Sequence, residues 1–325
     1  MANQPNFFLI GAPKCGTTAV AKALAAHREI FMSEPKEPQY FIYTQGNPYG
    51  FRPDSNVSNK DDYLALFDFA GNAKIVGEAS AHYICAPHVA DELYAFNPRA
   101  KIMAILRNPV ERAYSGYLFW YQYAKFAPIS PEDFRDKFFN GSFNSTAVPG
   151  KGDYQPMEFL RSFGFYHRLL QPYYAAFPRS QILVSSYDQL KADPAGFLRR
   201  VLAFLEVDDS TATPISTANV TVEPRLKALD FWLNLDTGNH MRRLAKRMLG
   251  SSEIAHAVRA TVNRLNRRKV PAAEFVSDKL FREMIEVYQT DIIELSKLVG
   301  MDFTPWLQRA PIVPSRNEQI LHDPA

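Results

Sequence analysis

Residues 7–26, FFLIGAPKCGTTAVAKALAA, predict a strand, a glycine-containing loop and a helix. The first four residues are apolar, as in a short buried strand. The last ten are rich in alanine and place Val20 and Leu24 on one helical face. A strand, a tight loop and a helix in this order present backbone N–H groups and a helix N-terminus to a phosphate. The stretch therefore predicts an anion site within an α/β fold.

The loop nearly matches the Walker A pattern, G-x-x-x-x-G-K-[ST]. Gly11 and Gly16 have the spacing of that pattern, but Thr17 stands at the position of its lysine. The lysine of this loop is Lys14, which lies between the two glycines. We therefore expect a phosphate loop with a chemistry that explains the displaced lysine.

Composition restricts the class of protein and of partner. The chain has 325 residues, 46% hydrophobic and 22% charged, which is typical of a globular protein. A net charge of +3 is too small to favour nucleic acid as the main partner, whereas a local basic pocket suffices for a small phosphate-rich ligand. Two cysteines, Cys15 and Cys85, do not make a disulfide framework and indicate reduced thiols in a cytoplasmic protein. We expect neither a signal peptide nor a transmembrane segment, because no apolar run approaches ~20 residues.

Five short apolar segments alternate with predicted helices. They are residues 7–10, 30–32, 74–80, 101–106 and 181–185. The alternation predicts a P-loop-like three-layer α/β fold with a central, mostly parallel sheet of about five strands flanked by helices. We expect one domain over residues 1–325, with variable insertions on the acceptor side near residues 44–72, 127–156 and 206–260. The tail at residues 311–325 is expected to be mobile.

Ligands of such sheets bind beyond the carboxyl ends of the strands. The loops at that edge should bring seven polar side chains toward one cleft: Lys14, Thr17, Thr18, Glu37, Ser80, Arg107 and Ser115. Glu37 lies between two prolines in a loop that they keep extended and rigid. Pro109 is placed to begin a helix directly after Arg107, with Ser115 about two turns along it.

Three segments together resemble the sulfotransferase family that uses 3′-phosphoadenosine 5′-phosphosulfate (PAPS). They are PKCGTT at residues 13–18, KEP at residues 36–38 followed by Tyr40 and Phe41, and RNPVERAYSGY at residues 107–117. The similarity is closest to the bacterial and heparan-sulfate-type branch and covers roughly residues 7–307. It implies a transferase that moves a sulfuryl group from PAPS and releases adenosine 3′,5′-bisphosphate, without a requirement for a metal.

The resemblance also implies roles for individual residues. Lys14 would stabilise the leaving phosphate oxygen and Glu37 would be the general base. Arg107 and Ser115 would hold the 3′-phosphate, Tyr166 would lie beside the cofactor, and a late basic loop would cover it. The full set of implied cofactor-binding residues is Pro13, Lys14, Cys15, Gly16, Thr17, Thr18, Arg107, Ser115, Tyr166, Arg267, Arg268 and Lys269.

The acceptor side is less defined by sequence. Ser80, His82 and His167 are candidates to line its pocket. The heparan branch often has histidine where this chain has Gln39 and lysine where it has Ala79, so a glycosaminoglycan acceptor is not implied. We expect a hydroxyl, or as a second choice an amine, of a carbohydrate, lipid or small molecule. The sequence leaves the oligomeric state open.

Several alternatives stay open on the residues alone. Arg107 could form a helix-start ion pair with Glu111, and Glu37 could be a solvated loop carboxylate, with Glu34 as a rival base. Residues 267–269 could be a solvated basic turn, and either candidate histidine could be structural. At the level of function, the rivals are a P-loop nucleotidase or kinase that binds Mg²⁺-ATP and a non-catalytic nucleotide-binding protein on the same scaffold.

Overall fold

The computed structural model describes residues 4–44, 57, 59–124, 130–140, 159–209, 215, 222–224, 267–269 and 276–309. Its centre is a five-stranded sheet in the order β2-β3-β1-β4-β5, in which every neighbouring pair is parallel. The strands are β1 (Phe7–Gly11), β2 (Ile30–Met32), β3 (Ile75–Ala79), β4 (Lys101–Leu106) and β5 (Ile182–Ser186). The predicted α/β class and the parallel five-stranded sheet are confirmed.

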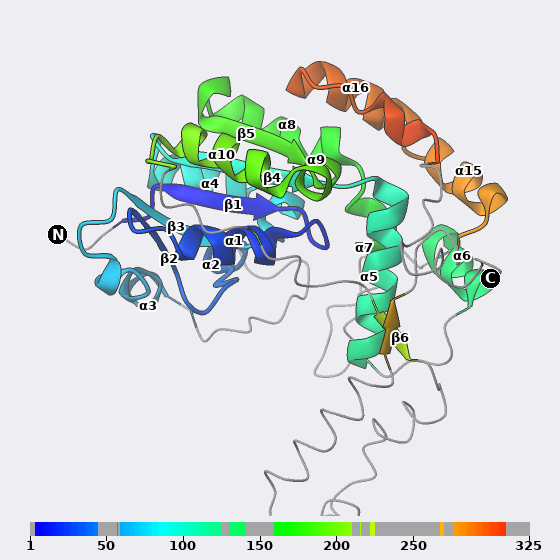
Figure 1. Cartoon of the computed structure of the whole chain (residues 1–325), viewed down its shortest axis with the longest axis horizontal. Coiled ribbons are helices and arrows are strands. Elements are labelled where there is room, and N and C mark those ends of the chain that lie inside the picture. The colour runs from blue at the N-terminus through cyan, green and yellow to red at the C-terminus, as the bar shows by residue number, and fades with distance from the viewer. Residues whose placement is uncertain are drawn as a thin grey trace, which may run out of the picture.

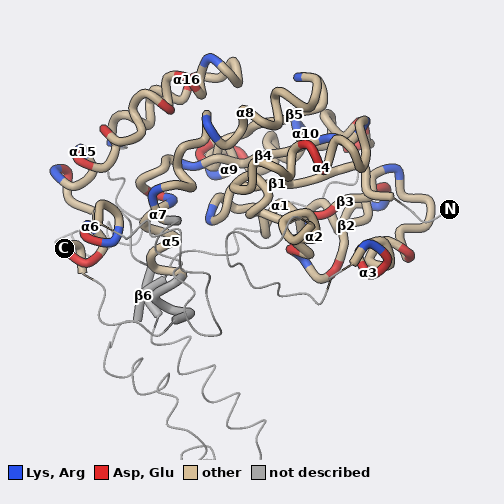
Figure 2. Tube along the Cα trace, turned by 180° about the vertical axis from the view of Figure 1, so that it is seen from behind, with Lys and Arg blue, Asp and Glu red and all other residues tan. Residues whose placement is uncertain are grey.

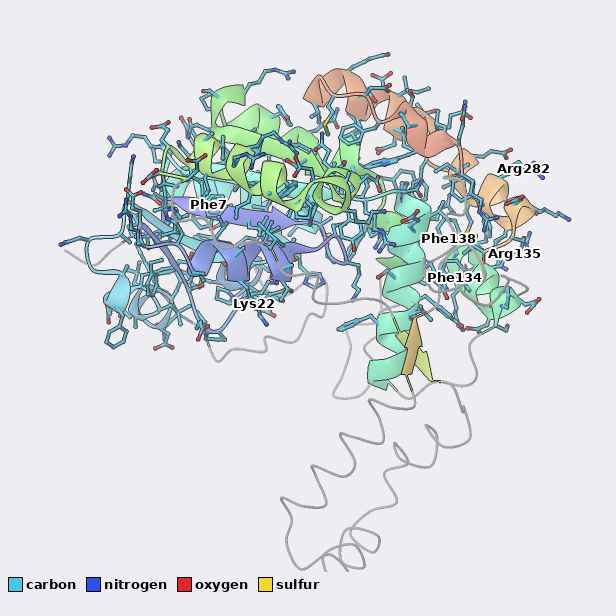
Figure 3. All side chains as sticks on the ribbon, viewed as in Figure 1. Phe7, Lys22, Phe134, Arg135, Phe138 and Arg282 are labelled. Carbon is cyan, nitrogen blue, oxygen red and sulfur yellow. The ribbon has the colours of Figure 1, made fainter. Side chains whose placement is uncertain are left out.

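The central strand β1 is buried along its whole length, and Phe7 lies at its start (Figure 3). Strands covered on both faces read as continuous apolar runs, which explains FFLIG here and KIMAIL in β4. Phe7 pairs with Gly77 of β3 in the register of the sheet. A Cβ on Gly77 would lie 2.7 Å from the Phe7 ring, so glycine is what lets the large side chain fit there.

Helices cover both faces of the sheet. They are α1 (Thr17–Ala25), α4 (Val89–Phe96), α8 (Tyr166–Ala176), α9 (Tyr187–Ala192) and α10 (Pro194–Leu205). Seen from front and back, α1 and α8 lie on opposite sides of β1 (Figures 1 and 2). Figure 2 shows β1 free of charged residues, whereas the outer helices carry both signs of charge. The charge pattern therefore follows the layers that the sequence predicted.

Helix α5 (Pro109–Ala124) stands beyond the carboxyl end of β1 (Figure 1), and α6 (Pro131–Asn140) packs beside it. Phe134 of α6 lies with its ring centroid 5.7 Å from that of Tyr114 and 5.1 Å from that of Tyr117. Phe134 and Phe138 face inward in Figure 3, whereas Arg135 extends to Glu283, 3.0 Å away. The segment expected as a variable insertion at residues 127–156 thus contains a packed helix.

The amphipathic pattern of residues 277–298 is typical of one helix, but the chain forms two here. They are α15 (Asp278–Glu286) and α16 (Gln289–Val299). Tyr288 at the break is fully buried, and its hydroxyl donates to the Arg161 carbonyl at 2.8 Å. This buried anchor fixes the chain where the two helices meet. Ser277 caps the start of α15, with its hydroxyl accepting from the Leu280 N–H at 3.2 Å.

The remaining described elements are short. They are α2 (Tyr40–Tyr43), α3 (Lys60–Ala65), α7 (Phe159–Ser162), β6 (Val222–Pro224), β7 (Arg267–Lys269) and the 3-10 turns Asp68–Ala70, Tyr83–Cys85, Arg179–Gln181 and Thr304–Leu307. β7 pairs with β6 in an antiparallel ribbon, so the late basic run is a strand and not the loop we expected. Residues 225–260 and the tail at 311–325 lie outside the described residues. Within the described part of the chain, no helix combines the length and the hydropathy needed to cross a bilayer.

Candidate active site

The predicted phosphate loop connects β1 to α1. Its backbone is left-handed at Lys14 (φ 69°) and at Gly16 (φ 91°), which turns the chain into the helix. A Cβ on Gly16 would lie 3.0 Å from Leu190 and 3.3 Å from Tyr187, so α9 closes the back of the loop. α1 begins without a side-chain cap and without an acidic residue in its first turn. The positive end of the helix is therefore suited to an anion.

The side chains of the loop divide between the core and the surface. Pro13 and Thr18 are partly exposed, Thr17 is buried, and Cys15 is fully buried. The Cys15 thiol lies 3.6 Å from the Pro13 carbonyl oxygen and 3.9 Å from the Tyr166 hydroxyl. Burial raises the pKa of this thiol to about 11, which suits packing and not nucleophilic chemistry. Of the implied cofactor contacts, Cys15 can therefore offer only its backbone.

Lys14 is the cation at the centre of the site. Its ammonium nitrogen lies 4.1 Å from the centroid of the Phe119 ring on α5. Burial, and next the charge of Arg107, lower the pKa of Lys14 to about 8, whereas the charge of Glu37 acts in the opposite direction. The charges of Arg107 and Glu37 thus both reach Lys14. Two cations held together in a partly buried place favour binding of an anion between them.

Arg107 follows β4 and forms the ion pair with Glu111 that the sequence left open. Its Nε and Nη2 atoms both lie 3.0 Å from Glu111 Oε2. The guanidinium carbon is 4.9 Å from the centroid of the Tyr187 ring, which places Arg107 beside the closed side of the phosphate loop. Ser115 is buried on α5, about two turns beyond.

Tyr166 lies behind the phosphate loop, and its side chain is fully buried. Its contact with a cofactor stays a prediction. Its hydroxyl donates to the Arg107 carbonyl at 2.9 Å and lies near Cys15. Tyr166 therefore connects the end of β4 with the phosphate loop from behind.

The loop that carries Glu37 is fixed to the carboxyl end of β3. Glu37 has a left-handed backbone (φ 63°), and its N–H donates to the Ala79 carbonyl at 3.1 Å. Two residues on, the Gln39 N–H donates to the Ser80 hydroxyl at 3.1 Å. Ser80 is fully buried, so it anchors this loop and does not line an acceptor pocket as expected.

The Glu37 carboxylate is surrounded by donors. Lys36 contacts Oε1, while Gln39 Nε2 at 3.3 Å and His82 Nδ1 at 3.4 Å contact Oε2. Burial alone would raise its pKa, but the His82 hydrogen bond and the charges of Lys36 and His82 outweigh burial and lower the pKa to about 2. Its rival Glu34 is exposed.

Of the two candidate histidines, the structure brings His82 to Glu37 and places His167 elsewhere. The His167 N–H donates to Asp291 of α16 at 3.0 Å, where α8 begins. The side chains of Arg267, Arg268 and Lys269 lie outside the described residues, so their contact with a cofactor stays a prediction.

Sequence reasoning missed Glu78, a fully buried carboxyl on β3. It accepts from Tyr63 and Tyr83 at 2.8 Å each and from Ser80 at 2.6 Å. Burial raises its pKa to about 7 despite these donors. The available signal was a single acid in an otherwise apolar strand, because such a residue needs buried partners.

Comparison with known proteins agrees with this geometry. Residues 4–228 match the family model described as "Sulfotransferase domain". The chain is 31% identical over 169 residues to carbohydrate sulfotransferase 15 of Rattus norvegicus, covering 41% of this chain and 29% of the relative. It is 24% identical over 327 residues to the bifunctional heparan sulfate N-deacetylase/N-sulfotransferase of Drosophila melanogaster, covering 94% of this chain and 27% of the relative. The chain thus spans less than a third of the length of either relative.

Among solved structures, the sulfotransferase from Alicyclobacillus acidocaldarius has the same fold. It aligns with a TM-score of 0.66 and 23% identity, over 94% of this chain and 100% of that one. The family match covers well over half of the present chain. The chain therefore belongs to the sulfotransferase family.

Proposed function

We propose that this protein transfers a sulfuryl group from PAPS to an acceptor hydroxyl. One observation carries the proposal: Lys14, Arg107 and Glu37 come from three loops at the carboxyl edge of the sheet, and the charges of Arg107 and Glu37 both act on the pKa of Lys14. Two of them are cations suited to a donor with phosphates at both ends, and the third is a carboxylate suited to the acceptor side. The sulfotransferase domain supports the same reaction class.

The residues present fit the donor. The uncapped start of α1 and the left-handed Lys14–Gly16 turn form a cradle for the 5′-phosphosulfate, with the Thr17 and Thr18 N–H groups at the helix start. Arg107, with Ser115 on α5, would grip the 3′-phosphate, since a guanidinium offers two parallel donors to a phosphate.

PAPS, when bound, supplies the sulfuryl group and a phosphate as the leaving group. Lys14 holds a positive charge where the leaving oxygen gains negative charge, and charge stabilisation of this kind is often the largest single contribution to catalysis. The protein's other task is to accept the proton of the acceptor hydroxyl, which we assign to the groups around Glu37. Such general-base assistance is typically worth about 10²–10⁴ in rate.

We take a carbohydrate as the first acceptor class to test. The names of the relatives specify carbohydrate and heparan sulfate transfer, and the match to the second of them covers 94% of this chain. Phe119 is 39% exposed beside Lys14, and an aromatic face of this kind packs well against a sugar or phenol ring. Lipid and small-molecule hydroxyls, and amines, are the further classes.

The experiment is a transfer assay with ³⁵S-labelled PAPS and a panel of acceptors. The panel contains 4-nitrophenyl glycosides, desulfated glycosaminoglycan oligosaccharides, an amino sugar, 4-nitrophenol and a long-chain alcohol. We expect label to move to at least one of them, with mass spectrometry locating one added sulfate per product. Lys14→Met serves as the inactive control. Labelled PAPS that stays intact with every acceptor and with water would contradict the proposal.

A further inference from the structure

The segment that carries Glu37 has a strained backbone. Glu37 and Gln39 are both left-handed, with φ of 63° and 55°. A left-handed residue other than glycine or asparagine is uncommon and persists only where the surrounding structure enforces it. The contacts of residues 37–41, here called the Glu37 segment, therefore decide where the Glu37 carboxylate lies.

Two of the contacts that hold the Glu37 segment are made by side-chain hydroxyls. The Gln39 N–H donates to the Ser80 hydroxyl at 3.1 Å, and the Phe41 N–H donates to the Tyr83 hydroxyl at 3.4 Å. A backbone N–H can only donate, so both hydroxyl oxygens must act as acceptors in these contacts. The proton of each hydroxyl must then go to a different acceptor.

Glu78 of β3 accepts both of these protons. The Ser80 hydroxyl donates to Glu78 Oε2 at 2.6 Å, and the Tyr83 hydroxyl donates to Oε1 at 2.8 Å. The Tyr63 hydroxyl also donates to Oε1 at 2.8 Å, but among the described residues it has no hydrogen bond to the Glu37 segment. All four side chains of this cluster are fully buried, so bulk water cannot replace a lost partner.

We propose that Glu78 is a positioning residue of the transfer reaction: it orients two hydroxyls, and these hold the segment that carries Glu37. Gln39 extends the effect to the carboxylate itself, because its side-chain amide donates to Glu37 Oε2 at 3.3 Å. The inference rests on the proposed sulfuryl transfer, in which groups around Glu37 receive the proton of the acceptor. Misplacement of a reacting group by about 1 Å can lower a rate about 10²-fold, so a fixed segment matters for turnover.

The role depends on the carboxylate form of Glu78. A carboxylate only accepts, whereas the amide of a glutamine places a donor on one of its two sides. In Glu78→Gln, the hydroxyl that faces this donor loses the acceptor of its proton and no longer has a fixed orientation. Burial raises the pKa of Glu78 to about 7, so experiments at pH 8 examine the ionised form.

The first test needs no turnover. Hydrogen exchange at pH 8, followed by mass spectrometry and resolved to residues 37–41, reports how firmly the segment is held. We expect exchange of the Gln39 N–H to be at least tenfold faster in Glu78→Gln and in Ser80→Ala than in the wild type. The same rate in wild type and in both variants would overturn the inference.

Tyr63→Phe is the matched control. Like Ser80→Ala, it removes one hydroxyl that donates to Glu78, but this hydroxyl does not reach the Glu37 segment. The ring is kept, and with it the stacking of residue 63 on Tyr40, whose centroid lies 4.6 Å away. Exchange of residues 37–41 should stay within twofold of the wild type. Exchange as fast as in Ser80→Ala would assign the effect to general loosening and overturn the positioning role.

The second test compares turnover with donor affinity at pH 8. With the panel acceptor that gives the highest rate, kcat should fall tenfold or more in Glu78→Gln and in Ser80→Ala. Bisphosphate affinity should stay within twofold of the wild type, because the phosphate loop lies in a different segment. Tyr63→Phe should keep kcat within threefold. Equal losses of kcat and of bisphosphate affinity would mean a purely structural role and contradict the proposal.

The outcomes separate the two levels of the account. Ser80→Ala retains Glu78 and removes only its link to Gln39, so it decides the question even where Glu78→Gln does not fold. Wild-type kcat, within threefold, in Ser80→Ala would overturn the positioning role and leave sulfuryl transfer standing. A wild type that transfers label to no acceptor and to no water molecule would overturn the proposed function, and the role of Glu78 in it.

Discussion

Arg107 and Glu111 form a two-nitrogen ion pair, with Nε and Nη2 of the arginine both 3.0 Å from Glu111 Oε2. The carboxylate holds the guanidinium where the 3′-phosphate is proposed to bind. A phosphate must therefore share or displace Glu111. We predict that Glu111→Gln binds adenosine 3′,5′-bisphosphate about two- to fivefold more tightly, most clearly at low salt, because partly exposed ion pairs are worth roughly 0.2–1 kcal/mol.

Isothermal titration at two salt concentrations measures this change. Glu132→Gln, on the exposed face of α6, is the control and should leave the affinity unchanged. Weaker binding in Glu111→Gln would mean that Glu111 orients Arg107 for the phosphate and does not compete with it.

Lys14 gives the binding site a pH dependence of known sign. Burial and the charge of Arg107 lower its pKa to about 8 in the free protein, so above this pH the free site loses a positive charge. An anion favours the protonated amine and must then take up a proton to bind. We predict that the affinity for the bisphosphate does not change with pH below about pH 8. Above this pH the affinity should fall, by up to about tenfold for each pH unit.

In Lys14→Met, the decrease of bisphosphate affinity above pH 8 should disappear, and binding should be weaker than in the wild type at every pH. Lys22→Met is the control, because Lys22 lies exposed on α1 (Figure 3) and should keep the wild-type profile. A profile in Lys14→Met that still bends near pH 8 would assign the titration to another group.

Gly16 combines a left-handed backbone with a close contact. Its φ is 91°, and an added Cβ would lie 3.0 Å from Leu190. Gly16→Ala should cost about 1–3 kcal/mol of stability and weaken bisphosphate binding at least tenfold, because the loop must shift. Gly71→Ala is the matched control: its φ is 56°, but an added Cβ meets nothing within 4 Å. Urea unfolding and titration should show a stability loss in both variants and a binding loss in Gly16→Ala alone; equal binding losses would contradict the account.

Glu78 should make stability depend on pH. Burial raises its pKa from the ordinary 4.5 to about 7 in the folded protein. As pH rises, the Glu78 carboxyl therefore loses its proton in the unfolded chain before it does so in the folded protein. The stabilisation of the folded state by protonated Glu78 is fully present below pH 4.5 and is lost as pH rises to 7. Relative to Glu78→Gln, we expect the wild type to lose on the order of 3 kcal/mol of unfolding free energy between pH 4.5 and pH 8. Urea unfolding at both pH values checks this, and Glu34→Gln, at an exposed position, is the control. The same change in unfolding free energy with pH in wild type and in Glu78→Gln would contradict the prediction.

The strands and the phosphate loop could be predicted because their signals are local. Buried parallel strands need apolar runs such as FFLIG and KIMAIL, and the turn into α1 needs Gly16. Because ligands of parallel sheets bind beyond the carboxyl ends of the strands, Lys14, Arg107 and Glu37 could be predicted at the same edge, and the charges of Arg107 and Glu37 both act on Lys14.

Other features of the site and the fold could not be predicted, because they depend on contacts between segments that are far apart in the sequence. Ser80 was expected in a pocket, but its hydroxyl is committed to Glu78 and Gln39. The hydrogen bond from the Tyr166 hydroxyl to the Arg107 carbonyl joins residues 59 positions apart and has no sequence signal. The amphipathic period of residues 277–298 continues through Tyr288, so the break between α15 and α16 has no sequence signal; it is seen in the buried contact of Tyr288 with Arg161.

The pairing of Glu37 with His82 also lay beyond the sequence pattern. The two residues are held together because the Glu37 N–H is fixed to the Ala79 carbonyl at the end of β3. A motif places Glu37 in its loop, but only the sheet brings the next strand's histidine to it.

The most direct measurement of the central claim, a site built for a 3′-phosphoadenylyl donor, compares thermal unfolding with two nucleotides. Adenosine 3′,5′-bisphosphate at 100 times its dissociation constant should stabilise the protein by about 2.7 kcal/mol. Mg²⁺-ATP at the same concentration should give a clearly smaller shift, and Lys14→Met should reduce the bisphosphate shift. Stabilisation by Mg²⁺-ATP without stabilisation by the bisphosphate would contradict the account.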